Sequence, residues 1–93
     1  MNKYFDMQQR PSVRHGYRLQ WEAAQSCHVL LYPEGMVKLN GSAGEIVSRC
    51  TGALSIQEIV ADLERTFDRT ALTDDVVQFL AHARTQGWID VQP

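Results

Sequence analysis

The chain lacks any long apolar run. Its apolar stretches fall well short of the roughly 20 residues that a membrane-spanning helix needs, and no charged segment followed by an apolar one opens the sequence. We therefore expect a cytoplasmic protein. With 93 residues, the chain is long enough for one domain with a modest core.

Cysteine is scarce as well, since Cys27 and Cys50 are the only two in the chain. The sequence has no CxxC or HxxxH pair, and the adjacent Cys27 and His28 would point to opposite faces of a strand. We therefore expect no metal site, and we interpret the two cysteines as small core residues. The sequence leaves their redox state open.

Positive charge is scarce outside the first twenty residues. Those twenty carry four basic residues and one acidic residue, whereas the rest of the chain carries five basic and ten acidic residues. An acidic surface repels the phosphates of DNA. A winged-helix DNA-binding module is therefore kept only as the alternative function, and nucleic acid is not an expected partner.

The sequence offers no catalytic constellation. Its serines lack the context of a nucleophile elbow, and Ser42 and Ser55 are better explained as helix caps. The acidic pair Asp74 and Asp75 fits the first turn of a helix, where negative charge is favourable. We therefore predict no catalytic residues and no enzymatic activity.

Residues 1–12 lack hydrophobic periodicity and are predicted to form a flexible N-terminal arm, followed by a single domain over residues 13–93. Within that domain the pattern predicts an alternating strand over 17–23, an apolar central strand over 28–32 and a short strand over 36–39. A turn at Pro33–Gly35 joins the last two strands. The expected arrangement is a three-stranded antiparallel sheet whose last strand lies at an edge.

Two helices are predicted from capping signals. The first is expected to begin at Asn40 or Ser42, with Glu45 completing a capping box three residues after Ser42. The second is expected to begin at Ser55, with Glu58 as the matching partner.

A third helix, predicted to begin with Thr73 as its N-cap and to end at Gly87, carries more apolar residues than one core uses. They spread over roughly 200° of the helix surface, against the roughly 100° that core packing needs: Leu72, Val76, Val77, Phe79, Leu80, Ala81 and Ala83. Either the surplus faces a groove or a partner, or the helix is packed on two sides. The elements together predict an α+β, winged-helix-like fold, with three helices following the sheet.

The strand over 36–39 suggests peptide recognition. An extended peptide can pair with an open sheet edge, so that its backbone supplies affinity and its alternate side chains fill pockets. Proline at Val37 is expected to remove an edge donor and to leave the fold intact. The same edge could instead pair two copies of the chain in a homodimer, and Lys38 could equally be a solvated charge that protects the edge.

Four segments of the chain carry a family resemblance: GYRLQWE (16–22), HVLLYPEGMVKLN (28–40), AGEIVSRCTG (43–52) and DVVQFL with GW over 75–88. Together they resemble the PqqD family of pyrroloquinoline quinone (PQQ) biosynthesis. That family is the prototype of the RiPP recognition elements, the domains that bind precursor peptides in ribosomal peptide modification pathways. The likeness covers about residues 11–89 and departs from the family at Thr51, where an acidic residue is expected.

The resemblance implies a non-catalytic peptide chaperone with a winged-helix-like fold. It implies that the chain binds the leader of the precursor peptide PqqA as an added strand. The chain would then present that peptide to PqqE, a radical SAM enzyme that joins a glutamate and a tyrosine side chain. The iron–sulfur clusters and S-adenosylmethionine would belong to that enzyme, and no cofactor is expected in this chain. A monomer is expected, with an edge-paired or domain-swapped homodimer as the alternative. The implied peptide-binding residues are Met36, Val37, Lys38, Leu39, Val76, Phe79, Leu80 and Ala83.

Overall fold

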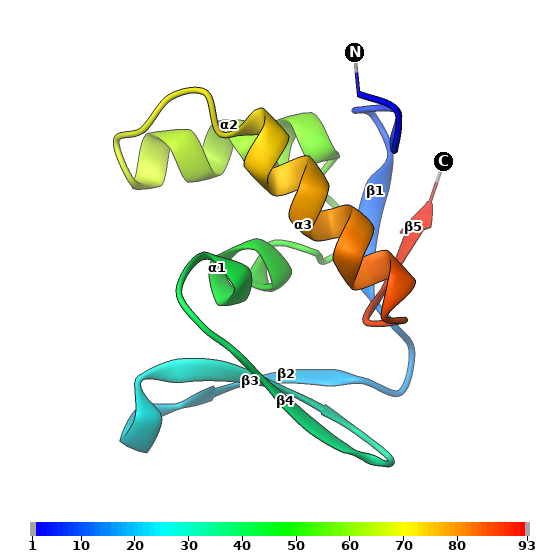
Figure 1. Ribbon diagram of the computed structural model, residues 1–93, viewed down its shortest axis with the longest axis vertical. Coiled ribbons are helices and arrows are strands. Elements are labelled where there is room, and N and C mark those ends of the chain that lie inside the picture. Colours follow the sequence, from blue (N-terminus) through cyan, green and yellow to red (C-terminus); the bar gives the residue numbers. More distant parts are fainter. Residues whose placement is uncertain (1, 93) are drawn as a thin grey trace.

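The computed structural model describes residues 2–92. A three-stranded sheet lies at one end of the molecule, a two-stranded sheet runs along one side, and three helices pack between and above them (Figure 1). In chain order the elements are β1 (Arg10–Val13), β2 (Arg18–Glu22), the short 3-10 helix η1 (Ala23–Gln25), β3 (Cys27–Tyr32), β4 (Gly35–Leu39), α1 (Ser42–Ser48), α2 (Ile56–Thr66), α3 (Thr73–Thr85) and β5 (Ile89–Gln92).

The three-stranded sheet is antiparallel in the order β2-β3-β4, which confirms the predicted sheet. Residues in register share a face, so Leu30 lies between Leu19 and Val37 on the inner face, which the helices cover. Val29 points to the outer face and is also fully buried, although Figure 1 shows no helix on that side. Side chains of the neighbouring strands must therefore cover Val29.

Trp21 is an aromatic residue of β2 that the helices do not cover. It shares the inner face with His28, and the two rings meet edge to face with centroids 5.0 Å apart. Its side chain is nevertheless 55% exposed. The η1 end of the sheet extends past α1, the helix nearest to the sheet (Figure 1), which leaves Trp21 without a covering layer.

The segment before residue 13 is packed on the domain, in contrast to the flexible arm that the sequence predicts. Phe5 is 6% exposed and belongs to the core, and β1 pairs antiparallel with β5. The carbonyl oxygens of Gln9 and Met7 accept hydrogen bonds from the N–H groups of Ile56 and Gln57, at 2.9 and 3.0 Å. The first turn of a helix leaves such N–H groups without intrahelical partners, so the start of α2 holds the segment in place.

The predicted capping box at the start of α2 is confirmed. The Ser55 hydroxyl oxygen accepts a hydrogen bond from the Glu58 N–H at 3.1 Å, and the Glu58 carboxylate accepts one from the Ser55 N–H at 2.8 Å. The pKa of Glu58 is lowered, mainly by its hydrogen bond with the Ser55 backbone and to a smaller extent by its hydrogen bond with the Ser55 side chain. This local pattern fixes where α2 begins.

The caps predicted for the other two helices are wrong. Gly41, in the left-handed region at φ 51°, is the N-cap of α1, so Ser42 is already the first helical residue and makes no cap bond. At α3 the cap position belongs to Leu72, whose N–H donates to the Glu64 carboxylate at 3.0 Å. Thr73 is therefore helical as well. In each case the preceding connection, rather than a local hydroxyl, sets the start of the helix.

The wide apolar arc of α3 is explained by its position between two hydrophobic clusters. Val77 and Leu80 are almost fully buried in the cluster formed with α2. Phe79 packs against both that cluster and the one over the three-stranded sheet. The helix is therefore packed on two sides, which was one of the two alternatives. After Gly87 at φ 79° the chain turns, and Ile89 enters the core.

Candidate functional site

The outer edge of β4 presents unpaired backbone groups. The two residues that close a two-residue hairpin turn exchange hydrogen bonds, and here they are Tyr32 and Gly35. Hydrogen-bonded and non-hydrogen-bonded pairs then alternate along the antiparallel ladder. The N–H and C=O groups of Met36 and Lys38 therefore point away from β3, toward the open edge.

Val37 has the opposite orientation, which corrects the expectation for a proline there. It stands in register with Leu30 in a hydrogen-bonded pair, so its N–H belongs to the ladder between β3 and β4. Proline at Val37 would therefore damage the sheet. Lys38 is the position at which proline removes an edge donor.

The other edge of the same sheet, β2, is less suited to pairing. Arg18 Nη2 donates to Gln20 Oε1 at 3.2 Å, and Gln20 Nε2 donates to Glu22 Oε1 at 2.7 Å. Such a row of charged and polar side chains is typical of an edge protected against strand addition. We therefore place the candidate site at β4.

The side chains of β4 alternate between the two faces of the sheet. Val37 and Leu39 lie on the inner face, where Leu39 is 3% exposed. Met36 and Lys38 lie on the outer face, and Met36 is 52% exposed. A strand added at this edge would meet apolar side chains on the inner side and a methionine and a lysine on the outer side.

Burial separates the four α3 residues that were proposed for the site. Val76, Leu80 and Ala83 are at most 2% exposed and belong to the core cluster shared with α2. Phe79 is partly buried and packs against the sheet cluster that includes Val37. Phe79 is therefore the α3 side chain best placed to contact a strand beside β4.

A pocket of about 640 Å³ lies near the end of β4, and Gly41 and Ser42, two and three residues after Leu39, line it. This volume is in the range of typical ligand sites. Its apolar lining comes from all three helices and the connection between α2 and α3: Ile46, Leu63, Phe67, Leu72, Val76 and Phe79. We call this hollow the α1–α3 pocket.

Charged side chains also line the α1–α3 pocket: Glu45, Arg69 and Asp75. The sequence did not indicate that Phe67 and Asp75 line a common pocket. Phe67 ends α2 and Asp75 lies in the first turn of α3, so their common position depends on how two helices pack. No local pattern in the sequence signals that arrangement.

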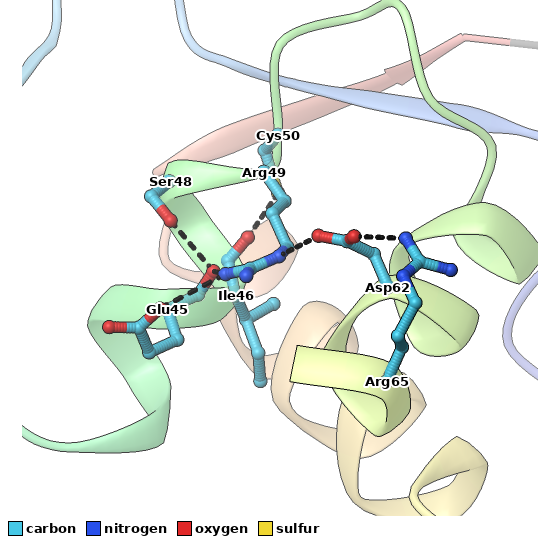
Figure 2. A network of polar contacts seen from close by, with 7 residues as sticks. All are labelled: Glu45, Ile46, Ser48, Arg49, Cys50, Asp62 and Arg65. Atoms are coloured by element: carbon cyan, nitrogen blue, oxygen red, sulfur yellow. Dashed lines mark hydrogen bonds and ion pairs between the residues drawn. The ribbon is translucent and has the colours of Figure 1, made fainter. Parts of the chain in front are cut away.

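A polar network holds α1 against α2 (Figure 2). Arg49 Nε donates to Asp62 Oδ2 at 2.6 Å, and Arg49 Nη1 donates to Glu45 Oε1 at 3.0 Å. Arg65 also donates to Asp62. The hydrogen bond from Arg49 is the main reason why the pKa of Asp62 is lowered. Glu45 lines the pocket, so the network fixes one of its walls relative to α2.

Neither cysteine offers a reactive centre. Both thiols are free and buried, and burial raises the pKa of Cys50 to about 12. The Cys50 thiol donates to the carbonyl oxygen of Ile46 at 3.3 Å (Figure 2). Across residues 2–92, no group of three His, Cys, Asp or Glu side chains is arranged to hold a metal ion. Within the same stretch, no helix has the length and apolarity to cross a membrane.

The arrangement of the sheet and the helices is similar to that of a solved structure. The solution NMR structure of the PqqD truncation of Methylobacterium extorquens PqqCD is described as a functional and stand-alone RiPP recognition element. It superposes with a TM-score of 0.72 over 86% of this chain and 87% of that chain, at 24% sequence identity. The likeness at this identity concerns the fold.

Sequence comparison establishes the family. The model for coenzyme PQQ synthesis protein D (PqqD) matches residues 27–89, so the chain belongs to the PqqD family. A "PqqA binding protein" of Azotobacter vinelandii is 51% identical over 87% of this chain and 89% of its own length. One from Stutzerimonas stutzeri is 46% identical over 90% of this chain and 92% of its own length.

Proposed function

We propose that this protein binds a PqqA precursor peptide in PQQ biosynthesis, by adding a segment of the peptide as a fourth strand beside β4. The outward backbone groups of Met36 and Lys38 are the observation that carries the proposal. Family membership supports it, since relatives with nearly half or more of their residues identical are named for PqqA binding. The bound segment is the leader part of the precursor.

The edge supplies affinity and the side chains around it supply selectivity. Two N–H and two C=O groups of β4 pair with the backbone of the peptide. Backbone groups of this kind are present in a peptide of any sequence, so these bonds do not select one sequence over another. Phe79 and Val37 flank the inner side of the added strand. Lys38 lies on its outer side, where an acidic peptide residue would be favoured over a basic one.

We further propose that the protein acts as a chaperone rather than as an enzyme. It holds the peptide extended and presents it to PqqE, the radical SAM enzyme that modifies it. A leader held at one edge leaves the rest of the peptide free, so the modified residues can enter another protein's active site. The protein acts in the cytoplasm. It acts as a monomer, because the bound peptide occupies the edge through which two copies could pair.

Titration with synthetic PqqA, followed by the backbone amide resonances, tests the peptide-binding proposal. The resonances of Met36, Lys38 and Phe79 should shift saturably. Amides of the β2 edge, such as that of Leu19, should change little and serve as the internal control. Shifts centred on β2 would contradict strand addition at β4, and no shifts with excess peptide would contradict peptide binding altogether.

The handoff needs a separate measurement. Calorimetry with purified PqqE, using the protein alone and then the protein loaded with PqqA, should show binding in the loaded state. No detectable association in either state would contradict presentation to PqqE and leave the peptide-binding proposal in place.

A further inference from the structure

The α1–α3 pocket is continuous with the open edge of β4. Gly41 and Ser42 follow β4 after one intervening residue and line the pocket. Phe79 lines the same pocket and also packs in the sheet cluster with Val37. A peptide paired with β4 and continuing past Leu39 would therefore arrive at the mouth of the pocket.

The pocket offers an apolar surface that the fold itself leaves uncovered. Phe67 is 47% exposed although it is a large aromatic residue at the end of α2. Ile46 and Leu63, by contrast, are at most 4% exposed and form part of the pocket lining. A large apolar side chain entering here would remove the Phe67 ring from water, which is favourable in proportion to the area buried.

One carboxylate of the pocket is available to a basic neighbour of that side chain. Glu45, Asp75 and Arg69 are the charged residues of the lining. Glu45 is already bonded to Arg49. Asp75 makes none of the side-chain hydrogen bonds or ion pairs found among residues 2–92, so it is free to meet a cation.

We propose that the α1–α3 pocket binds the part of the precursor peptide that continues past the Leu39 end of β4. The pocket takes one aromatic or large aliphatic side chain that stands next to a Lys or Arg. This inference rests on the proposed function and adds a second point of attachment to it. Phe67 and Asp75 then determine specificity, whereas the β4 edge recognises only an extended backbone.

The test compares two variants with matched controls, with synthetic PqqA as the probe. Phe67→Ala is paired with Tyr4→Ala, because both aromatic side chains are 47% exposed and only Phe67 lines the pocket. Asp75→Asn is paired with Asp74→Asn, because both lie in the first turn of α3 and only Asp75 lines the pocket. Amide spectra of all four variants establish that the fold is retained.

Affinities are measured for full-length PqqA and for a series of peptides shortened from each end. Phe67→Ala should weaken binding of the full-length peptide about tenfold, as for an aromatic contact at the centre of an interface. Asp75→Asn should weaken it about threefold, as for an exposed charge pair. The two controls should bind like the parent protein, and shortening from one end should abolish both effects.

Two results would overturn the inference, and they are distinguishable. If full-length PqqA shifts the β4 amides but Phe67→Ala and Asp75→Asn bind it like their controls, the pocket is not used and strand addition stands. If full-length PqqA binds neither the parent protein nor any variant, the proposed function fails together with the inference.

Discussion

Gly44 in α1 lies so close to His28 in β3 that a Cβ atom at Gly44 would be 2.7 Å from His28 Nδ1 and 3.2 Å from His28 Cβ. The 2.7 Å contact would require the His28 ring to move, and the 3.2 Å contact would require a shift of a few tenths of an ångström at a Cβ that is bonded to the strand backbone. The absence of a side chain at Gly44 therefore allows α1 to approach the sheet closely.

Gly44→Ala should destabilise the protein for this reason. Alanine in a helix gains about 1 kcal/mol over glycine, but overpacking costs about 1–3 kcal/mol, so we expect a net loss of up to about 2 kcal/mol. Urea denaturation measures it. A His28→Ala background removes the ring and its 2.7 Å contact but keeps the Cβ at 3.2 Å, so the loss caused by Gly44→Ala should be smaller there. A loss of equal size in both backgrounds would contradict the proposed clash.

Proline substitutions distinguish the N–H groups of β4 that point toward β3 from those that point toward the open edge. Lys38→Pro removes an outward N–H and should weaken PqqA binding about tenfold with little change in stability. Val37→Pro breaks the ladder to β3 and should cost roughly 2 kcal/mol or more of unfolding free energy. Lys38→Ala keeps the N–H and controls for the lost charge. Equal binding by Lys38→Pro and Lys38→Ala would argue against strand addition.

Acid should weaken the link between α1 and α2. The pKa of Asp62 is lowered in the folded state, mainly by its hydrogen bond from Arg49, from an ordinary value of 3.8. The carboxylate therefore stabilises the fold above about pH 4 and loses this effect as the pH falls through its lowered pKa. Asp62→Asn should be less stable than the parent at pH 7, and the difference should shrink below pH 4.

Urea denaturation between pH 7 and pH 2.5 measures the Asp62 effect. Asp68→Asn makes the same change of charge in the connection after α2, away from Arg49, and is the control. A difference between Asp62→Asn and the parent that stays constant down to pH 2.5 would show that the carboxylate charge contributes nothing.

The N-terminal segment should contribute to global stability. Phe5 is 6% exposed, so Phe5→Ala should cost roughly 3 kcal/mol of unfolding free energy. Tyr4→Ala, at a neighbouring exposed ring, should change the free energy by less than about 0.5 kcal/mol. If both variants change the free energy of unfolding by the same small amount, the result would support the flexible arm that the sequence predicts.

Elements whose signals are local could be predicted from the sequence. The capping box of Ser55 and Glu58 lies within four consecutive residues and specifies the start of α2 wherever the helix packs. The turn at Pro33 and Glu34 likewise determines the pairing of β3 with β4. Both features therefore appear in the structure as expected.

Elements that depend on distant partners could not be predicted. β1 contains Pro11 and lacks alternation, and it becomes a strand because β5, at the far end of the chain, supplies its partners. Phe67 and Asp75 reach one pocket only because α2 and α3 pack in a particular way. The set proposed for α3 combines the partly buried Phe79 with three core residues for the same reason, since an apolar pattern does not show which of two clusters a side chain joins.

The pairing of β1 with β5 constrains the order in which the domain can be completed. Arg10 stands in register with Gln92, so this pairing cannot form until the last strand has been synthesised. On the ribosome, β1 would be only partly paired, through the bridge of Ser12 with Thr51, while the sheet and helices between β1 and β5 form. Closure of the domain would thus be a late event, and contacts so distant in sequence are expected to make it the slow step of folding.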